Sequence, residues 1–183
     1  MGDSAIEDTF RPFYEQHFAF VWKSLRRLGI AERDCSDVTQ DVFMIVHRNL
    51  STLLPSVKPT TWMFGICLRV ASDYRRRAVN RYEVLGDKGV PEPFDPPTAG
   101  EAVERKQAVT MLERMLESMP LEQRAVFVAF ELSGLQCTEI AEAFELPLGT
   151  VYSRLRLGRE HLQRFVERTK AKDRFTTGEV HHG

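Results

Sequence analysis

A short basic stretch near the end of the chain carries the side chains best suited to contact nucleic acid. Residues 146–149 include a proline and a glycine and predict a tight turn, and Thr150 is suited to cap the helix that follows. On that helix Val151, Leu155 and Leu162 form one buried stripe. The hydroxyl and guanidinium groups outside this stripe suit the base edges and phosphates of a major groove: Thr150, Tyr152, Ser153, Arg154, Arg156 and Arg159. A plain helical hairpin with a solvated basic face is the alternative interpretation.

Basic residues also gather in a second, separate segment. Positions 69–81 contain several arginines and only one acid, Asp73. Basic residues also outnumber acids at positions 153–174, whereas acids outnumber bases at positions 82–100, between the two basic segments. The formal net charge is only −1, so the distribution of charge is informative where its total is not. Two basic patches predict two separated contacts with a polyanion, although either patch alone would fit a solvated helix face.

Composition argues against an enzyme, a membrane protein and a disulfide scaffold. The chain is 43% hydrophobic and 28% charged, as in soluble globular proteins, and it has neither a secretion signal nor an apolar run of about 20 residues. Cys35, Cys67 and Cys137 are odd in number and far apart, which indicates a cytoplasmic, reducing location and no zinc site. We interpret them as buried hydrophobes, with a redox role left open. No catalytic motif or phosphate-binding loop is present, so we expect no catalytic residue, metal or cofactor.

Helical periodicity predicts an all-α protein made of two small domains. Apolar residues recur at helical spacing over residues 10–28, 34–50, 62–77, 101–119 and 120–134, and two shorter helices follow. Prolines and glycines between residues 80 and 100 predict a semi-extended linker that reaches roughly 70 Å at ~3.3 Å per residue. We therefore expect domains at 7–78 and 101–168, a linker at 79–100 and a tail at 169–183.

The stretch QCTEIAEAFELPLGTVYSRLRLGREHL, residues 136–162, resembles region 4 of the extracytoplasmic-function sigma factors. The resemblance implies a helix-turn-helix whose second helix reads the −35 promoter element. Three positions depart from the family pattern. Gln136 replaces the usual Ser or Thr cap, Glu145 stands where many such units have glycine, and Leu157 replaces a frequent arginine.

Two upstream segments resemble region 2 of the same family. Residues 34–48 are similar to its region 2.2, which implies that an exposed helix face docks on the polymerase β′ subunit: Asp37, Gln40, Asp41, Met44 and Arg48. Residues 61–77 are similar to its regions 2.3 and 2.4, which implies contacts with the melted −10 strand from Trp62, Arg69, Arg75, Arg76 and Arg77. Arg69 replaces the family's asparagine. We expect Phe64 to lie in the core and Asp73 to brace a nearby arginine.

The resemblance as a whole implies a sigma factor that is a monomer when free and directs promoter-specific transcription initiation. The partners implied are core RNA polymerase (β and β′ subunits), promoter DNA and an anti-sigma factor. The rival interpretation is a dimeric helix-turn-helix regulator, which would bind half-sites about 34 Å apart.

Overall fold

The computed structural model describes the chain at residues 3–85 and 101–178, and there it is built entirely of helices. Three long helices form the first half: α1 (Asp3–Leu28), α2 (Glu32–Asn49) and α3 (Pro59–Leu85), with a short 3-10 turn, η1 (Leu50–Thr52), after α2. The second half holds α4 (Glu101–Glu117), α5 (Leu121–Phe127), the π-helical turn η2 (Val128–Leu132), α6 (Cys137–Ala143) and α7 (Leu148–Gly178). No strand occurs in these ranges, which confirms the all-α prediction. Nor does any helix within them combine the length and apolar character needed to cross a membrane.

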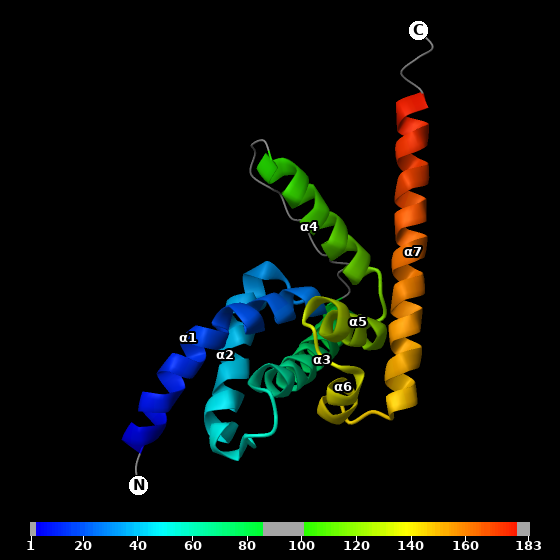
Figure 1. Cartoon of the computed structure of the whole chain (residues 1–183). Helices are drawn as coiled ribbons and strands as arrows, with labels where there is room; N and C mark the ends of the chain where they lie inside the picture. Colours follow the sequence, from blue (N-terminus) through cyan, green and yellow to red (C-terminus); the bar gives the residue numbers. More distant parts are fainter. Residues whose placement is uncertain (1–2, 86–100, 179–183) are drawn as a thin grey trace.

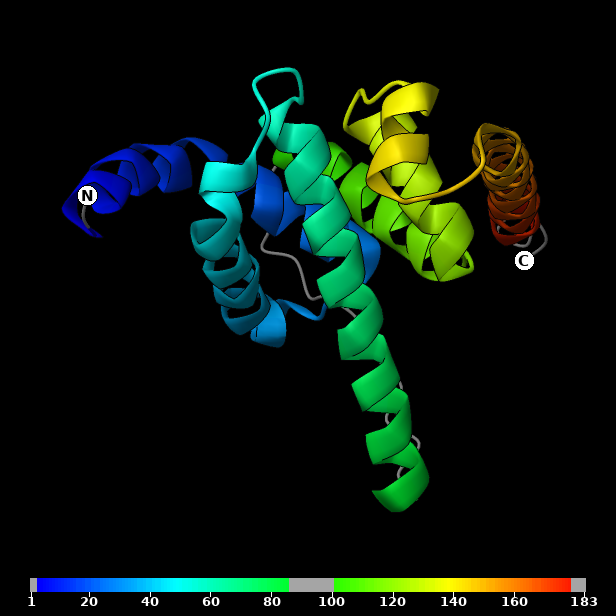
Figure 2. The same cartoon turned by 90° about the horizontal axis from the view of Figure 1, so that it is seen from below.

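The first half is a three-helix bundle in which each helix buries one apolar stripe. Leu25 of α1, Val42 of α2 and Met63 of α3 are fully buried where the helices meet. Gly29 ends α1 with a φ of 95°, a left-handed backbone that glycine adopts without strain. This turn sends α2 back along α1, and the later part of α3 projects beyond the body of the molecule (Figure 2).

In the second half, α5 is packed closely against the long helix α7 (Figure 1). Val151 and Leu155 are buried, as the predicted stripe requires, and Leu162 is half-buried. Gly158 permits the close approach of the two helices, because a Cβ at this position would lie 3.1 Å from a ring carbon of Phe127. The short helix α6 packs against α7 to form the helix-turn-helix.

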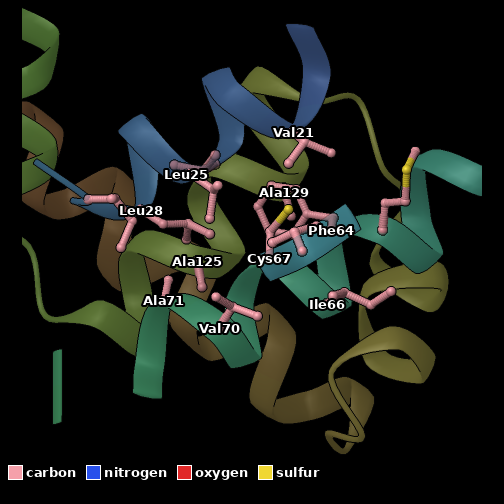
Figure 3. Close-up of a cluster of buried hydrophobic side chains, with 14 of the residues drawn as sticks. Val21, Leu25, Leu28, Phe64, Ile66, Cys67, Val70, Ala71, Ala125 and Ala129 are labelled. Carbon is pink, nitrogen blue, oxygen red and sulfur yellow. The ribbon is translucent and has the colours of Figure 1, made fainter. Parts of the chain in front are cut away.

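The two halves also pack against each other and share one hydrophobic core. Figure 3 shows Leu25, Leu28 and Val70 of the first half beside Ala125 and Ala129 of the second. α1 contacts α4, α5 and η2, while α3 contacts α6. The sequence predicted two domains joined by a linker, and their mutual packing is a further finding of the structure.

Several helix ends differ from the prediction. α1 begins at Asp3 rather than near residue 10, with Pro12 inside it. α3 continues through residues 79–85, the first part of the predicted linker, because no proline precedes Pro91 in that segment. α7 likewise runs on to Gly178, since residues 169–178 contain no proline. The remaining predicted linker, 86–100, lies outside the described residues, as does the end of the tail, 179–183.

Candidate nucleic-acid interface

The start of α7 exposes most of the polar side chains that the sequence nominated for DNA contact. The side chain of Tyr152 stands out, since the residue is 55% exposed although it is aromatic. Ser153, Arg156 and Arg159 are exposed as well, and Arg154 is half-buried at the margin of the stripe, as expected. Hydroxyls and guanidinium groups therefore occupy one solvent-facing side of the second helix of the helix-turn-helix.

We predicted that Thr150 caps this helix, and that prediction is wrong. α7 already begins at Leu148, and the backbone N–H groups of Thr150 and Val151 donate to the carbonyl of Pro147, at 2.9 and 3.2 Å. The helical hydrogen bonds thus start at Pro147, whose fixed φ suits a helix start. Thr150 lies inside the first turn, where its carbonyl accepts a hydrogen bond from the Ser153 hydroxyl at 2.9 Å.

Two arginines of the exposed face are held in place by acidic neighbours. The Arg156 guanidinium is hydrogen-bonded to the carboxylate of Glu160 one turn later. Arg159 donates to Glu131 of η2 at 2.7 Å and lies 5.4 Å from the centroid of the Phe130 ring. These contacts order the arginines before any ligand binds, although exposed ion pairs of this kind stabilise a fold only weakly.

The turn between α6 and α7 is closed by the main chain around a strained residue. Glu145 has a φ of 54°, in the left-handed region that glycine usually occupies. The N–H of Glu145 donates to Glu142 at 3.2 Å, and that of Leu146 donates to Ala141 at 2.9 Å. These two bonds satisfy carbonyls at the end of α6 in the Schellman arrangement. The turn therefore forms although Glu145 stands in place of glycine, and it carries the Glu145 carboxylate.

At the other end of α6, Glu139 supplies the carboxylate half of a capping box with Gln136 at the N-cap. The backbone N–H of Gln136 donates to Glu139 at 2.8 Å, and the Lys58 ammonium lies 2.8 Å from the same carboxylate. The Lys58 hydrogen bond, followed by that of Gln136, lowers the pKa of Glu139 below its usual range. Glu139 is thus ionised and helps to fix the start of the first helix of the helix-turn-helix.

On α2 the structure bears out the predicted division between a buried and an exposed face. Val38, Val42 and Val46 are buried. The residues nominated for polymerase docking are all exposed: Asp37, Gln40, Asp41, Met44 and Arg48.

Three residues of this face, Gln40, Met44 and Arg48, also line a hollow of about 580 Å³ that sequence reasoning missed. Its walls include Phe10, Tyr14 and Phe18 of α1 and Phe43 of α2, and the ring centroids of Tyr14 and Phe43 are 4.5 Å apart. The signal was the spacing of Phe10, Tyr14 and Phe18, each four residues from the next and therefore on one helix face.

Of the α3 residues predicted to contact the −10 strand, some are exposed to solvent and others are half-buried at the edge of the core. Arg76 and Arg77 are exposed, Arg75 and Trp62 are half-buried, and Phe64 is fully buried, as expected. Asp73 braces Arg76 through a 2.8 Å hydrogen bond, which confirms its predicted role.

Arg69 lies close to the turn of the helix-turn-helix. Its side chain is 60% exposed, and it reaches to 4.0 Å from the carboxylate of Glu145. Arg69, which we predicted to contact the −10 strand, therefore lies close to the α6–α7 turn of the helix-turn-helix, which we predicted to contact the −35 element.

The cysteines behave as buried hydrophobes. Cys35 and Cys67 are buried and Cys137 is half-buried, and all three are free thiols. Burial raises the pKa of both the Cys35 and the Cys67 thiol, which disfavours the reactive thiolate. Throughout the described ranges, no three His, Cys, Asp or Glu side chains converge as a metal site would need.

Comparison with known proteins gives matches in both halves of the chain. Residues 13–81 match sigma-70 region 2, and residues 110–162 match sigma-70 region 4. The extracytoplasmic-function (ECF) RNA polymerase sigma factor SigE of Mycolicibacterium smegmatis is 29% identical over 166 residues, which make up 90% of this chain and 64% of SigE. SigW of Bacillus subtilis, also an ECF sigma factor, is 25% identical over 86% of this chain and 89% of its own.

Solved structures of similar fold cover both halves as well. CnrH, in complex with the cytosolic domain of CnrY, has a TM-score of 0.63 at 22% identity over 88% of this chain and 89% of that chain. The sigma factor RpoE of Bartonella quintana, in complex with the anti-sigma factor NepR, has a TM-score of 0.64 at 17% identity over 84% of this chain and 96% of that chain. With both sigma-70 regions matched in order along one all-helical chain, the protein belongs to the extracytoplasmic-function group of sigma-70 family RNA polymerase sigma factors.

Proposed function

We propose that this chain recruits core RNA polymerase to promoters, with residues 101–168 reading the −35 element and residues 7–78 binding polymerase and the −10 strand. The observation that carries the proposal is the exposed face of α7, where Tyr152, Ser153 and Arg156 follow directly on a helix-turn-helix turn. Side chains in the first turns of such a helix are the ones that reach base edges in a major groove. Sigma factors are not enzymes, and the proposed role is one of binding throughout.

The −35 contact is assigned to the exposed and marginal residues at the start of α7: Thr150, Tyr152, Ser153, Arg154, Arg156 and Arg159. Arginine forms two hydrogen bonds with guanine, and hydroxyls form hydrogen bonds with bases or phosphates. Leu157 is half-buried rather than exposed, which favours Arg156 as the base contact over the position that the family pattern would nominate.

The −10 strand is assigned to α3, through Trp62 and the arginines at 69, 75, 76 and 77. Guanidinium groups offer charge to phosphates and flat faces to unpaired bases, and the half-buried Trp62 has part of its ring available for stacking. The contact with the polymerase β′ subunit is assigned to the exposed face of α2: Asp37, Gln40, Asp41, Met44 and Arg48. An anti-sigma factor is the proposed regulator, and the free chain is proposed to be a cytoplasmic monomer.

The test compares two substitutions in run-off transcription with core polymerase. Arg156→Ala removes one groove contact, so −35-dependent transcript is expected to fall roughly tenfold while affinity for core stays unchanged. Asp41→Lys reverses the charge of the α2 face, so affinity for core is expected to fall with promoter preference retained. Each variant is thus the other's control. Arg168→Ala, which removes an exposed arginine further along α7, controls for loss of charge.

An exchange of the two outcomes would show that the domains are assigned the wrong way round. If the chain bound a palindrome as a dimer and gave no transcript with core, it would be a conventional regulator instead. Gel filtration of the free chain decides the oligomeric state in the same experiment.

A further inference from the structure

A second hollow, of about 360 Å³, lies where α1 contacts the end of η2. Leu132, the last residue of η2, and Ser133, which follows it, form one wall. The other wall consists of residues that recur at helical spacing and therefore share one face of α1: Ala19, Phe20, Lys23, Ser24 and Arg27. Polar side chains from two segments far apart in the sequence thus line the same space.

Two cations line this hollow, and among the described residues no carboxylate lines it. The Arg27 guanidinium donates to the carbonyl of Leu132 at 3.2 Å, which leaves its other N–H groups available. Lys23 is exposed, and within the described ranges neither cation forms an ion pair with an acid. Burial lowers the pKa of Arg27, as expected for a cation that is partly withdrawn from water without an anion beside it. The hollow therefore carries an unbalanced positive charge.

Two serine hydroxyls accompany the cations. The Ser133 hydroxyl oxygen is buried and has no hydrogen-bond partner among the described residues, and Ser24, on the opposite wall, is 1% exposed. Buried polar groups are almost always hydrogen-bonded, so an unpaired hydroxyl at the wall of a hollow indicates a partner that enters the hollow. A water molecule would satisfy the hydroxyl alone. An anion would satisfy the hydroxyl and balance the charge of Lys23 and Arg27 as well.

The backbone next to Ser133 has an uncommon conformation. η2 is a π-helical turn that continues α5, and beyond it the N–H of Leu135 donates to the carbonyl of Ala129 at 3.0 Å. Single π-helical turns within helices are rare and occur frequently at functional sites. Since successive residues of an α-helix are about 100° apart, the extra residue in such a turn rotates the following side chains by about that angle. The position of Ser133 on this wall therefore depends on the π-helical turn.

We propose that this hollow binds one phosphate group, either as free phosphate or as the phosphate of a small monoester. Arginine donates paired hydrogen bonds to phosphate oxygens, lysine adds a point charge, and serine hydroxyls donate to the remaining oxygens. A volume of about 360 Å³ is many times the roughly 30 Å³ of a water molecule, so the organic part of a monoester also fits, against Phe20 and Leu132. Two facing walls suit a single phosphate group better than the continuous backbone of a DNA strand. The site shares no residue with the proposed promoter contacts.

Calorimetric titration of the full chain tests the site, in a chloride buffer of constant ionic strength without phosphate or sulfate. The probes are inorganic phosphate, ribose 5-phosphate and ribose. We expect one phosphate site per chain, with ribose 5-phosphate bound more tightly than inorganic phosphate and ribose not bound. Lys23→Gln removes one charged donor and is expected to weaken binding roughly tenfold. Lys170→Gln removes the same charge from an exposed position on α7 and is expected to leave the affinity unchanged. Equal affinity for inorganic phosphate and ribose 5-phosphate would support the site with free phosphate as its ligand.

A second variant separates binding from folding. Ser133→Ala removes a hydroxyl that has no partner in the described chain, so the thermal midpoint without ligand is expected to stay the same or rise. Affinity for ribose 5-phosphate is expected to fall severalfold in this variant, and the rise in thermal midpoint on adding the ligand to shrink with it. No binding of either phosphate probe, or equal affinities in Lys23→Gln and Lys170→Gln, would overturn the site. Binding abolished by Arg156→Ala but not by Lys23→Gln would also overturn it, because the phosphate would then lie on the proposed DNA face.

Discussion

Arg124 is a buried cation whose hydrogen bonds go to main-chain carbonyls. It is 2% exposed and donates to Glu117 at 2.7 Å and Met119 at 3.3 Å, besides Leu28 of the other half. Burial, and then the neighbouring Arg75, lowers its pKa to about 10, which still leaves it charged at neutral pH. A single side chain thus joins the end of α1 to the turn between α4 and α5.

Replacing Arg124 by methionine should destabilise the fold strongly. Methionine fills a similar volume, but it leaves the carbonyls of Leu28, Glu117 and Met119 without their donor in a buried site. We expect a loss of about 3 kcal/mol in the free energy of unfolding, measured by urea denaturation. Arg114→Met, at an exposed position of α4, is the control and should change stability little. Equal stability of the two variants would mean that these hydrogen bonds contribute nothing.

Glu139 should make stability depend on pH in the acid range. Its pKa is lower in the folded chain than its unperturbed value of 4.5, so its contribution is present above pH 4.5 and is lost as pH falls through the folded value. Glu139→Gln should therefore be less stable than the parent at pH 7, and the difference should be smaller at a pH well below 4.5. Urea titrations at both pH values measure this. A difference that stayed constant with pH would contradict the assigned interactions of this carboxylate with Lys58 and Gln136.

At the scale of elements, the helix-turn-helix depends on how closely α7 crosses α5. A Cβ on Gly158 would lie 3.1 Å from Cδ2 and 3.3 Å from Cβ of Phe127, tighter than ordinary van der Waals contact. The proposed reading face lies on the preceding turns of the same helix. Any shift of α7 away from α5 therefore also displaces Tyr152 and Arg156.

Gly158→Val is expected to lower the free energy of unfolding by about 2 kcal/mol, because the branched side chain cannot fit against Phe127. Thermal unfolding followed by circular dichroism measures the loss. Gly149→Val places the same side chain in open space on the same helix and should change stability by less than about 0.5 kcal/mol. If both variants lost stability equally, the cost would lie in helix propensity rather than in packing.

Helical periodicity predicted which residues of each element are buried, but not what covers them. The burial of Val42 and Val151 and the exposure of Met44 followed from spacing alone, because a helix repeats every 3.6 residues. Spacing contains no information on distant partners, so the reach of Arg124 to Leu28 was not predictable. The ends of α3 and α7 were misjudged because no proline or glycine directly follows the expected last residue. For the strained turn, the sequence offered only the departure from glycine at Glu145 as a sign.

On the scale of the whole molecule, the shared core couples the folding of the two halves. Buried residues of α1 and α3 pack with those of α5 and η2 in one cluster. Both tryptophans, Trp22 and Trp62, belong to the first half, whereas helix content is spread over both. Tryptophan fluorescence and circular dichroism therefore report on different parts of the same cooperative unit.

A substitution in the second half should accordingly be felt by the tryptophans of the first. Val126→Ala removes two methyl groups from a fully buried side chain in α5 and should cost about 2 kcal/mol. Fluorescence and circular dichroism are expected to give one coincident urea transition, shifted equally in the variant. A fluorescence transition unmoved by Val126→Ala would show that the halves unfold independently.

The contacts between the halves differ in how they respond to ionic strength. The pairs at the rim, Lys58 with Glu139 and Arg69 with Glu145, have at least one partner largely in contact with solvent, so mobile ions screen their attraction. Arg27 donates to the carbonyl of Leu132 and Arg124 to that of Leu28, and these bonds are more deeply buried and are screened far less. Raising the salt concentration therefore loosens the rim while leaving the arginine bonds in place.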